Sequence, residues 1–117
     1  MRKPESEFLR GLLASPDRTE ALEWLKRGSG KNNIGELSYD ESLKIVENLY
    51  EWGAVEVSVA KISVVEGFGS TDNVLIGMSD NPESREKIFT WLNELAENMG
   101  LVPQPDEGQR YMLAWFD

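Results

Sequence analysis

The stretch LKRGSGKNNIG, from Leu25 to Gly35, places glycines and a lysine where they could hold a phosphate group. The Walker A loop of nucleotide-binding proteins has the pattern G-x-x-x-x-G-K-[ST] between a strand and a helix. If Gly30 and Lys31 were its second half, Leu25 would replace the first glycine and Asn32 the hydroxyl residue that binds magnesium. The segment also follows a predicted helix rather than a strand. We therefore predict a helix end followed by a linker, and no nucleotide site.

Histidine and cysteine are both absent from the 117 residues. Their absence excludes Ser-His-Asp and Cys-His catalysis, thiolate nucleophiles, disulfides and imidazole or thiolate metal ligands. Acid–base chemistry would have to use Asp, Glu, Lys or Tyr. A glycosidase-type mechanism needs two carboxylates at a fixed separation in a cleft, and nothing in the sequence places two there. We predict no catalytic residue, no bound cofactor and no metal ligand.

The net charge is −9, and the acidic residues are concentrated after residue 31. Residues 1–31 carry seven basic and five acidic side chains, whereas residues 32–117 carry five basic and sixteen acidic ones. An acidic surface repels nucleic acids and anionic membranes, so we expect neither as a partner. No apolar run approaches the roughly 18 residues of a membrane span, and no signal peptide is evident. We expect a cytoplasmic protein whose partner is another protein.

One helix, predicted over residues 39–52, carries a mixed but mainly acidic polar face. Asp40, Lys44, Glu47 and Glu51 share that face at helical spacing. One interpretation is a solvated surface on which Asp40 and Lys44 pair at i, i+4. The other is an acidic ridge that docks a basic partner.

Trp24 and Arg85 are two further candidates for binding. Trp24 lies beside a narrow apolar stripe, which suits either core packing or a partner interface, where aromatic residues are enriched. Arg85 lies near the apolar stripe of its helix. It could pack its stem on the core with its head in water, or anchor an anionic ligand.

Local signals define the elements that must position these residues. Ser15 and Pro16 predict a helix start at residue 16, and Ser38 with Glu41 predicts a capping box before the helix at 39–52. Asn81 and Pro82 predict the start of a second amphipathic helix, which Gly100 ends. Residues 54–64, 73–79 and 109–116 alternate or are apolar enough for strands, with a hairpin loop at 66–72.

The order from Ser38 onward is α-β-β-α-β, which predicts an α+β two-layer sandwich with two helices on a small three-stranded sheet. The order is that of a ferredoxin-like fold without its first strand, unless residues 32–37 supply one. A right-handed crossover through the last helix would make the final strand parallel to the one before it. We expect one domain over residues 1–117, with an N-terminal helical extension at 1–31 and a core at 38–117.

These observations favour binding over catalysis. We expect a small acidic protein-interaction or regulatory domain of unassigned specific role. The alternatives are a ferredoxin-like sensor of a small ligand and a histidine-free enzyme that uses Asp, Glu, Lys or Tyr. A homodimer would use either the open sheet edge or the N-terminal helices, and a monomer would fold those helices onto its own sheet.

Overall fold

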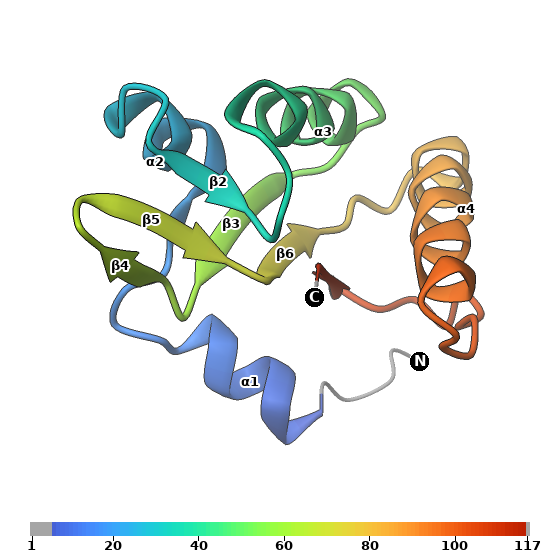
Figure 1. Cartoon of the computed structure of the whole chain (residues 1–117). Coiled ribbons are helices and arrows are strands. Elements are labelled where there is room, and N and C mark those ends of the chain that lie inside the picture. Colours follow the sequence, from blue (N-terminus) through green and yellow to red (C-terminus); the bar gives the residue numbers. More distant parts are fainter. Residues whose placement is uncertain (1–5, 117) are drawn as a thin grey trace.

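The computed structural model describes residues 6–116, which form a mixed α+β fold of four helices and two sheets (Figure 1). Residues 1–5 and 117 of the predicted domain lie outside the described residues. The helices are α1 (Glu7–Leu13), α2 (Ala21–Arg27), α3 (Tyr39–Glu51) and α4 (Pro82–Asn98). The strands are β1 (Thr19–Glu20), β2 (Asn32–Ile34), β3 (Glu56–Ala60), β4 (Ser63–Val65), β5 (Phe68–Thr71), β6 (Asn73–Gly77) and β7 (Tyr111–Trp115).

The caps predicted for the two long helices are confirmed. In α3, the Glu41 N–H donates to Ser38 Oγ at 3.1 Å, and the Ser38 N–H donates to Glu41 Oε1 at 3.1 Å. In α4, Asn81 accepts from the Ser84 N–H at 3.0 Å, and Pro82 occupies the first turn. Both caps satisfy backbone donors that a helix start leaves without partners, so they define where the helices begin.

The predicted helix start at Ser15 is wrong, because Ser15 is engaged in a turn. Its hydroxyl donates to Asp17 Oδ1 at 2.6 Å, and Asp17 accepts the backbone N–H groups of Lys61 and Ile62 at 3.0 and 2.8 Å. These long-range bonds hold the segment as a turn. Helix α2 begins instead after Glu20, whose carboxylate accepts two backbone N–H groups of its first turn.

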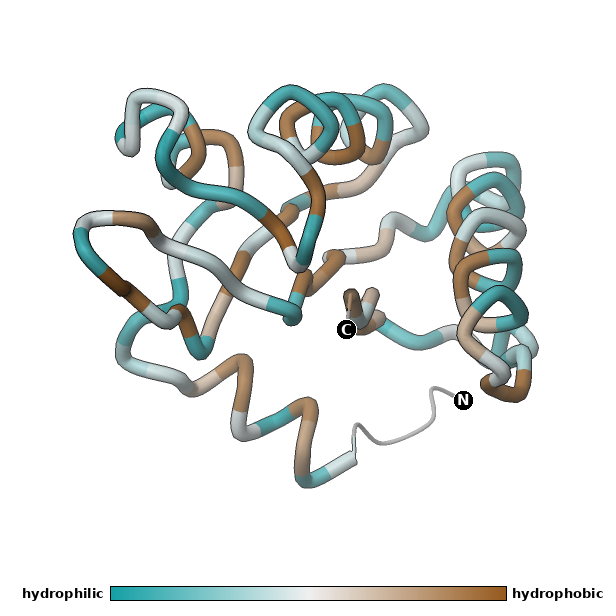
Figure 2. Tube along the Cα trace, viewed as in Figure 1, coloured by the Kyte–Doolittle hydropathy of each residue, from teal (hydrophilic) through white to brown (hydrophobic). Residues whose placement is uncertain are grey.

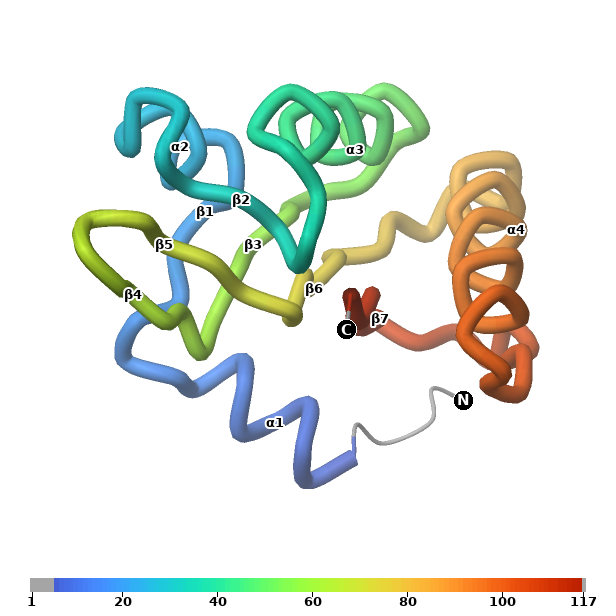
Figure 3. The backbone as a smooth tube through the Cα atoms, in the orientation of Figure 1, coloured from blue at the N-terminus to red at the C-terminus, as the bar shows by residue number. Residues whose placement is uncertain are grey.

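The larger sheet has the strand order β1-β3-β6-β7, and every neighbouring pair in it is antiparallel. Figure 3 shows β1 beside β3. The predicted parallel placement of the last strand is therefore wrong. The prediction that the main sheet has three strands is also wrong, because it has four. The N-terminal segment contributes to this sheet as well, because β1 pairs with β3 through Thr19 and Glu20.

The direction of β7 depends on the segment that follows α4. After Gly100 the chain runs back along the helix, where Asn93 Oδ1 accepts the Gln104 N–H at 3.0 Å. It reaches the start of the helix at Arg85, which binds Asp106, and meets the end of β6, where the Met78 N–H donates to the Arg110 carbonyl at 2.8 Å. Because this return segment brings the chain back to the end of β6, β7 starts beside that end and runs antiparallel to β6.

A second, three-stranded sheet has the order β2-β5-β4. Residues 32–34 do form a strand, but it pairs parallel to β5 in this sheet and adds nothing to the larger one. Strands β4 and β5 form a hairpin whose turn is Glu66–Gly67, with φ of 54° and 84°. The long strand predicted at 54–64 is thus two strands, separated at Lys61, where φ is 55°.

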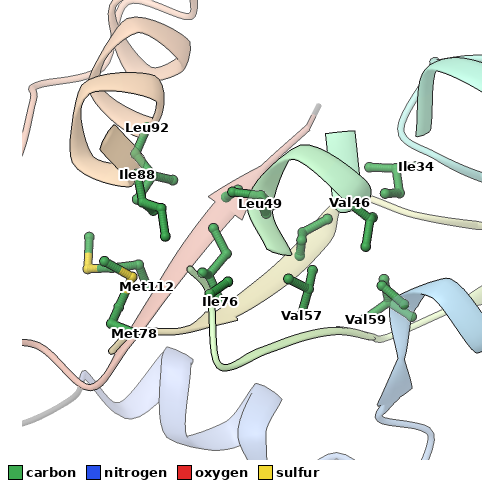
Figure 4. Packing of buried hydrophobic residues seen from close by; sticks show 14 of the residues in the cluster. Ile34, Val46, Leu49, Val57, Val59, Ile76, Met78, Ile88, Leu92 and Met112 are labelled. Atoms are coloured by element: carbon green, nitrogen blue, oxygen red, sulfur yellow. The ribbon is translucent and has the colours of Figure 1, made fainter. Parts of the chain in front are cut away.

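The core lies on both faces of the larger sheet, so this part of the molecule has three layers. On one face, α3 and α4 pack on Val57, Ile76 and Met112 (Figure 4), and buried residues of α2 belong to the same cluster. On the other face, Leu12 of α1 packs on Ala60, Leu75 and Leu113. Apolar and polar residues alternate along α3 and α4 in Figure 2, as their amphipathic sequences predict.

Candidate functional site

The acidic face predicted for α3 is exposed. Asp40, Lys44, Glu47 and Glu51 are all accessible to solvent. None of the four forms an ion pair with any residue between 6 and 116, so the predicted Asp40–Lys44 pair is not present. The carboxylates of this ridge therefore face solvent.

Trp24 and Arg85 are both buried, so neither lies where the binding interpretation would require it. Trp24 is only 4% exposed and belongs to the core, which leaves it no surface for a partner. Arg85 is 7% exposed, and its guanidinium binds the carboxylate of Asp106 and the Ser79 carbonyl while packing over the Phe89 ring. Its donors are occupied within the fold, so it does not present itself to an external anion.

The glycine-containing loop after α2 leads into β2, the reverse of the strand–loop–helix order of a phosphate loop. Asn32 occupies the position of the magnesium-binding hydroxyl residue, and its side chain is hydrogen-bonded to backbone groups within the fold. It donates to the Trp24 carbonyl at 2.7 Å and accepts the Gly69 N–H at 3.2 Å. The loop therefore connects α2 to the smaller sheet.

One hollow lies between the end of α3 and the exposed face of α4. It has a volume of about 580 Å³. Trp52 and Trp91 lie against each other in its wall, with ring centroids 6.3 Å apart and ring planes inclined by 57°. The remaining lining residues recur along one face of α4: Glu83, Glu86, Lys87, Thr90 and Glu94. We call this hollow the tryptophan pocket.

A glycine brings the two tryptophans together. Gly53 follows Trp52 with φ of 102°, a conformation that L side chains rarely adopt. A Cβ atom on Gly53 would lie 2.4 Å from Ser84 Oγ, so the end of α3 touches the first turn of α4. Trp52 and Trp91 each lie at the edge of the core, partly buried against it. The close approach at Gly53 is what turns those edges into one pocket.

The pocket is electronegative as well as aromatic. Three carboxylates, those of Glu83, Glu86 and Glu94, surround it against one ammonium group, that of Lys87. All four side chains are exposed, and within the described part of the chain none of them has an ion-pair partner. A cation is attracted by the face of an indole ring and by free carboxylates, so both features select for positive charge.

A larger, apolar groove of about 890 Å³ runs along β7 between α1 and α4. Phe8 and Leu9 of α1 line one side, and residues of α4 and of the segment after it, including Leu101 and Val102, line the other. Most of its lining residues are apolar, and the polar ones include Asn93, Gln104, Glu107 and Gln109. We call it the β7 groove.

One polar cluster joins β1, α3 and β3. The hydroxyl of Tyr50 donates to Glu20 Oε2 at 2.7 Å and accepts the Val57 N–H at 3.0 Å. Burial, together with the bond to Glu20 and the negative charge there, raises the pKa of Tyr50 to about 12. Neither the tryptophan pocket nor the β7 groove includes these residues. The cluster fastens α3 to the sheet, and it does not supply a reactive group to either hollow.

Over residues 6–116, no group of three acidic side chains is placed to hold a metal ion. No helix in that range is long and apolar enough to cross a membrane. Comparisons of the chain with protein-family models, with curated proteins and with solved structures find no match.

Proposed function

We propose that the protein is a non-catalytic interaction module that binds a basic segment of a partner protein, with an arginine side chain held in the tryptophan pocket. The observation that carries this proposal is the meeting of Trp52 and Trp91 in one hollow with three unpaired carboxylates. A planar guanidinium stacks on an indole ring and donates several hydrogen bonds to carboxylates, and it is less strongly hydrated than an ammonium group.

The charge of the whole chain supports the same kind of partner. With a net charge of −9, the protein attracts a basic chain over distances longer than a contact, which raises the rate of encounter. Glu51 precedes Trp52 directly, so the exposed acidic face of α3 leads toward the pocket. The carboxylates of Asp40, Glu47 and Glu51 on that face would then guide the residues that flank the arginine.

Titration with a short oligo-arginine peptide, followed by tryptophan fluorescence and calorimetry, tests the proposal. Trp52→Ala should weaken binding by about 2- to 30-fold, the range of a cation–π contact of roughly 0.5–2 kcal/mol. The double variant Glu86→Gln/Glu94→Gln should also weaken it. Glu66→Gln is the matched control, because Glu66 is an exposed carboxylate at the β4–β5 turn.

Oligo-lysine and oligo-glutamate peptides complete the design. We expect oligo-lysine to bind more weakly than oligo-arginine at the same charge, and oligo-glutamate not to bind. If Glu66→Gln lowers the affinity as much as the double variant does, binding is a general effect of charge and the pocket is not the site.

A further inference from the structure

The outer edge of the larger sheet is β7, and its hydrogen-bonding groups can be assigned from its pairing with β6. The Arg110 carbonyl accepts the Met78 N–H, and the Phe116 N–H donates to the Asp72 carbonyl, both at 2.8 Å. In an antiparallel strand, the N–H and C=O groups of one residue point to one neighbouring strand, and those of the next residue point to the opposite side. The even-numbered residues therefore bond to β6, and Tyr111, Leu113 and Trp115 direct their N–H and C=O groups away from the sheet.

This edge lies in the β7 groove, where large apolar side chains are exposed. Phe8, Leu101, Val102 and Trp115 line the groove and are 61%, 46%, 84% and 38% exposed. A concentration of exposed apolar surface beside unpaired backbone groups is typical of a contact surface.

The β7 edge also lacks the features that protect an edge from pairing. Its five residues, Tyr111–Trp115, include no charged residue and no proline. The opposite edge of the same sheet is protected, since β1 has only two residues and one of them is Glu20. Natural sheets usually carry charges, prolines or very short strands at their edges, and β7 has none of these.

We propose that β7 pairs with β7 of a second copy of the chain, antiparallel about a two-fold axis at Leu113. In this register Tyr111 faces Trp115 of the partner subunit, and Leu113 faces Leu113 of the partner subunit. The order of residue types along β7 is aromatic, apolar, leucine, apolar, aromatic, and it is the same when read in reverse. The strand is therefore its own complement, which favours a second copy over a foreign peptide.

The three outward-facing residues of each copy then exchange their N–H and C=O groups, which completes the ladder. Aromatic pairs such as Tyr111 with Trp115 of the partner subunit stabilise neighbouring strands. The axis is perpendicular to the sheet, so the two four-stranded sheets become one, and both copies carry α3 and α4 on the same face. This dimer is independent of the basic partner proposed above, because the tryptophan pocket shares no residue with the β7 groove.

Light scattering of the full chain tests the dimer. We expect a mass that rises with concentration to twice the 13.2 kDa of one chain. Trp115→Lys, which places a charge on the edge, should lower the association constant at least tenfold. Val64→Lys is the matched control, because Val64 is 68% exposed on the edge of the other sheet, and it should leave the mass unchanged.

Amide hydrogen exchange of the unmodified chain gives a second test that needs no variant. The N–H groups of Tyr111, Leu113 and Trp115 should exchange more slowly as the concentration rises, whereas other exposed amides should not change. The proposal is overturned if the chain keeps the mass of a monomer at about 1 mM, where a dimer with a Kd of that size would be evident. A dimer that Trp115→Lys leaves intact, or whose formation does not slow these three amides, would also overturn it.

Discussion

Arg85 holds both carboxylate oxygens of Asp106, with Nε 2.9 Å from Oδ2 and Nη2 2.8 Å from Oδ1. The two residues are 21 positions apart, at the start of α4 and near the end of the segment that returns along it. The guanidinium also donates to the Ser79 carbonyl at 3.0 Å, just before the helix. This ion pair ties the return segment to the end of β6, and so it determines where β7 joins the sheet.

Asp106→Asn should destabilise the fold, because it removes the charge that compensates a buried guanidinium. Breaking a fully buried pair costs about 3–5 kcal/mol. The side chain of Asp106 is 42% exposed, so water screens the pair and we expect a loss of about 1–3 kcal/mol. Urea unfolding measures it, with Glu97→Gln on the exposed face of α4 as the control. Equal stabilities of the two variants would show that the pair is not structural.

Stability should also fall in acid, because two aspartates have lowered pKa values in the folded protein. The hydrogen bonds from Arg85 lower the pKa of Asp106 below its ordinary 3.8. Burial opposes ionisation of Asp17, but hydrogen bonds from Ser15, Ile62 and Lys61 outweigh it and lower that pKa as well. A lowered folded-state pKa contributes stability that is complete above the unfolded value and lost as the pH falls through the folded value.

Unfolding free energies measured from pH 7 downward should therefore stay level until about pH 4 and decrease below it. Asp17→Asn and Asp106→Asn should each make that decrease smaller, since each removes one titrating group. A decrease that is the same in both variants as in the unmodified chain would assign it to other carboxylates.

Gly53→Ala should destabilise the fold and disturb the tryptophan pocket. The added Cβ would occupy a backbone with φ of 102° and lie 2.4 Å from Ser84 Oγ. We expect a loss of about 1–3 kcal/mol and a change in the near-ultraviolet circular dichroism of the Trp52–Trp91 pair. Gly100→Ala is the control, because Gly100 also has a positive φ, of 74°, but no atom lies within 4 Å of its added Cβ. It should cost less and leave the tryptophan spectrum unchanged.

Tyr50 should ionise late in an alkaline titration followed by ultraviolet absorbance. Its pKa is raised to about 12, so a tyrosine transition near that pH should disappear in Tyr50→Phe. The raised pKa means that the neutral form is favoured in the folded state. Its contribution to stability is complete below the unfolded value of 10.0 and is lost as the pH rises toward 12. If Tyr50→Phe instead loses absorbance change near pH 10, the ordinary value for tyrosine, Tyr50 is exposed to water.

Some of this fold follows from the sequence alone, because the signals involved are local. Ser38 and Glu41 are three residues apart and define the start of α3, and Asn81 with Pro82 defines the start of α4. The apolar stripes of both helices predicted that they pack on one sheet face, and Val46, Leu49, Ile88 and Leu92 do share one cluster. Hydrogen bonds and apolar spacing within a turn or two decide such features, so a sequence pattern reports them directly.

The candidate site could be predicted only in part. Its charge follows from the composition, and its two tryptophans, Trp52 and Trp91, lie 39 positions apart in the sequence. Their meeting was not predictable, since it depends on the approach of Gly53 to Ser84 across 31 positions of the chain. The glycine directly after Trp52, the residue that caps the end of α3, was the one signal that could have indicated the contact.

The sequence by itself determined where α3 and α4 begin, the absence of histidine and cysteine chemistry, and the net negative charge. Only the tertiary structure decided the direction of β7, the second sheet, and the burial of Trp24 and Arg85. Asp17 bonds to backbone groups 44 and 45 positions away, and Arg85 to a carboxylate 21 positions away. A buried charge or backbone donor needs a hydrogen-bond partner. Which residue provides it depends on how the whole chain packs, because the partner is distant in the sequence.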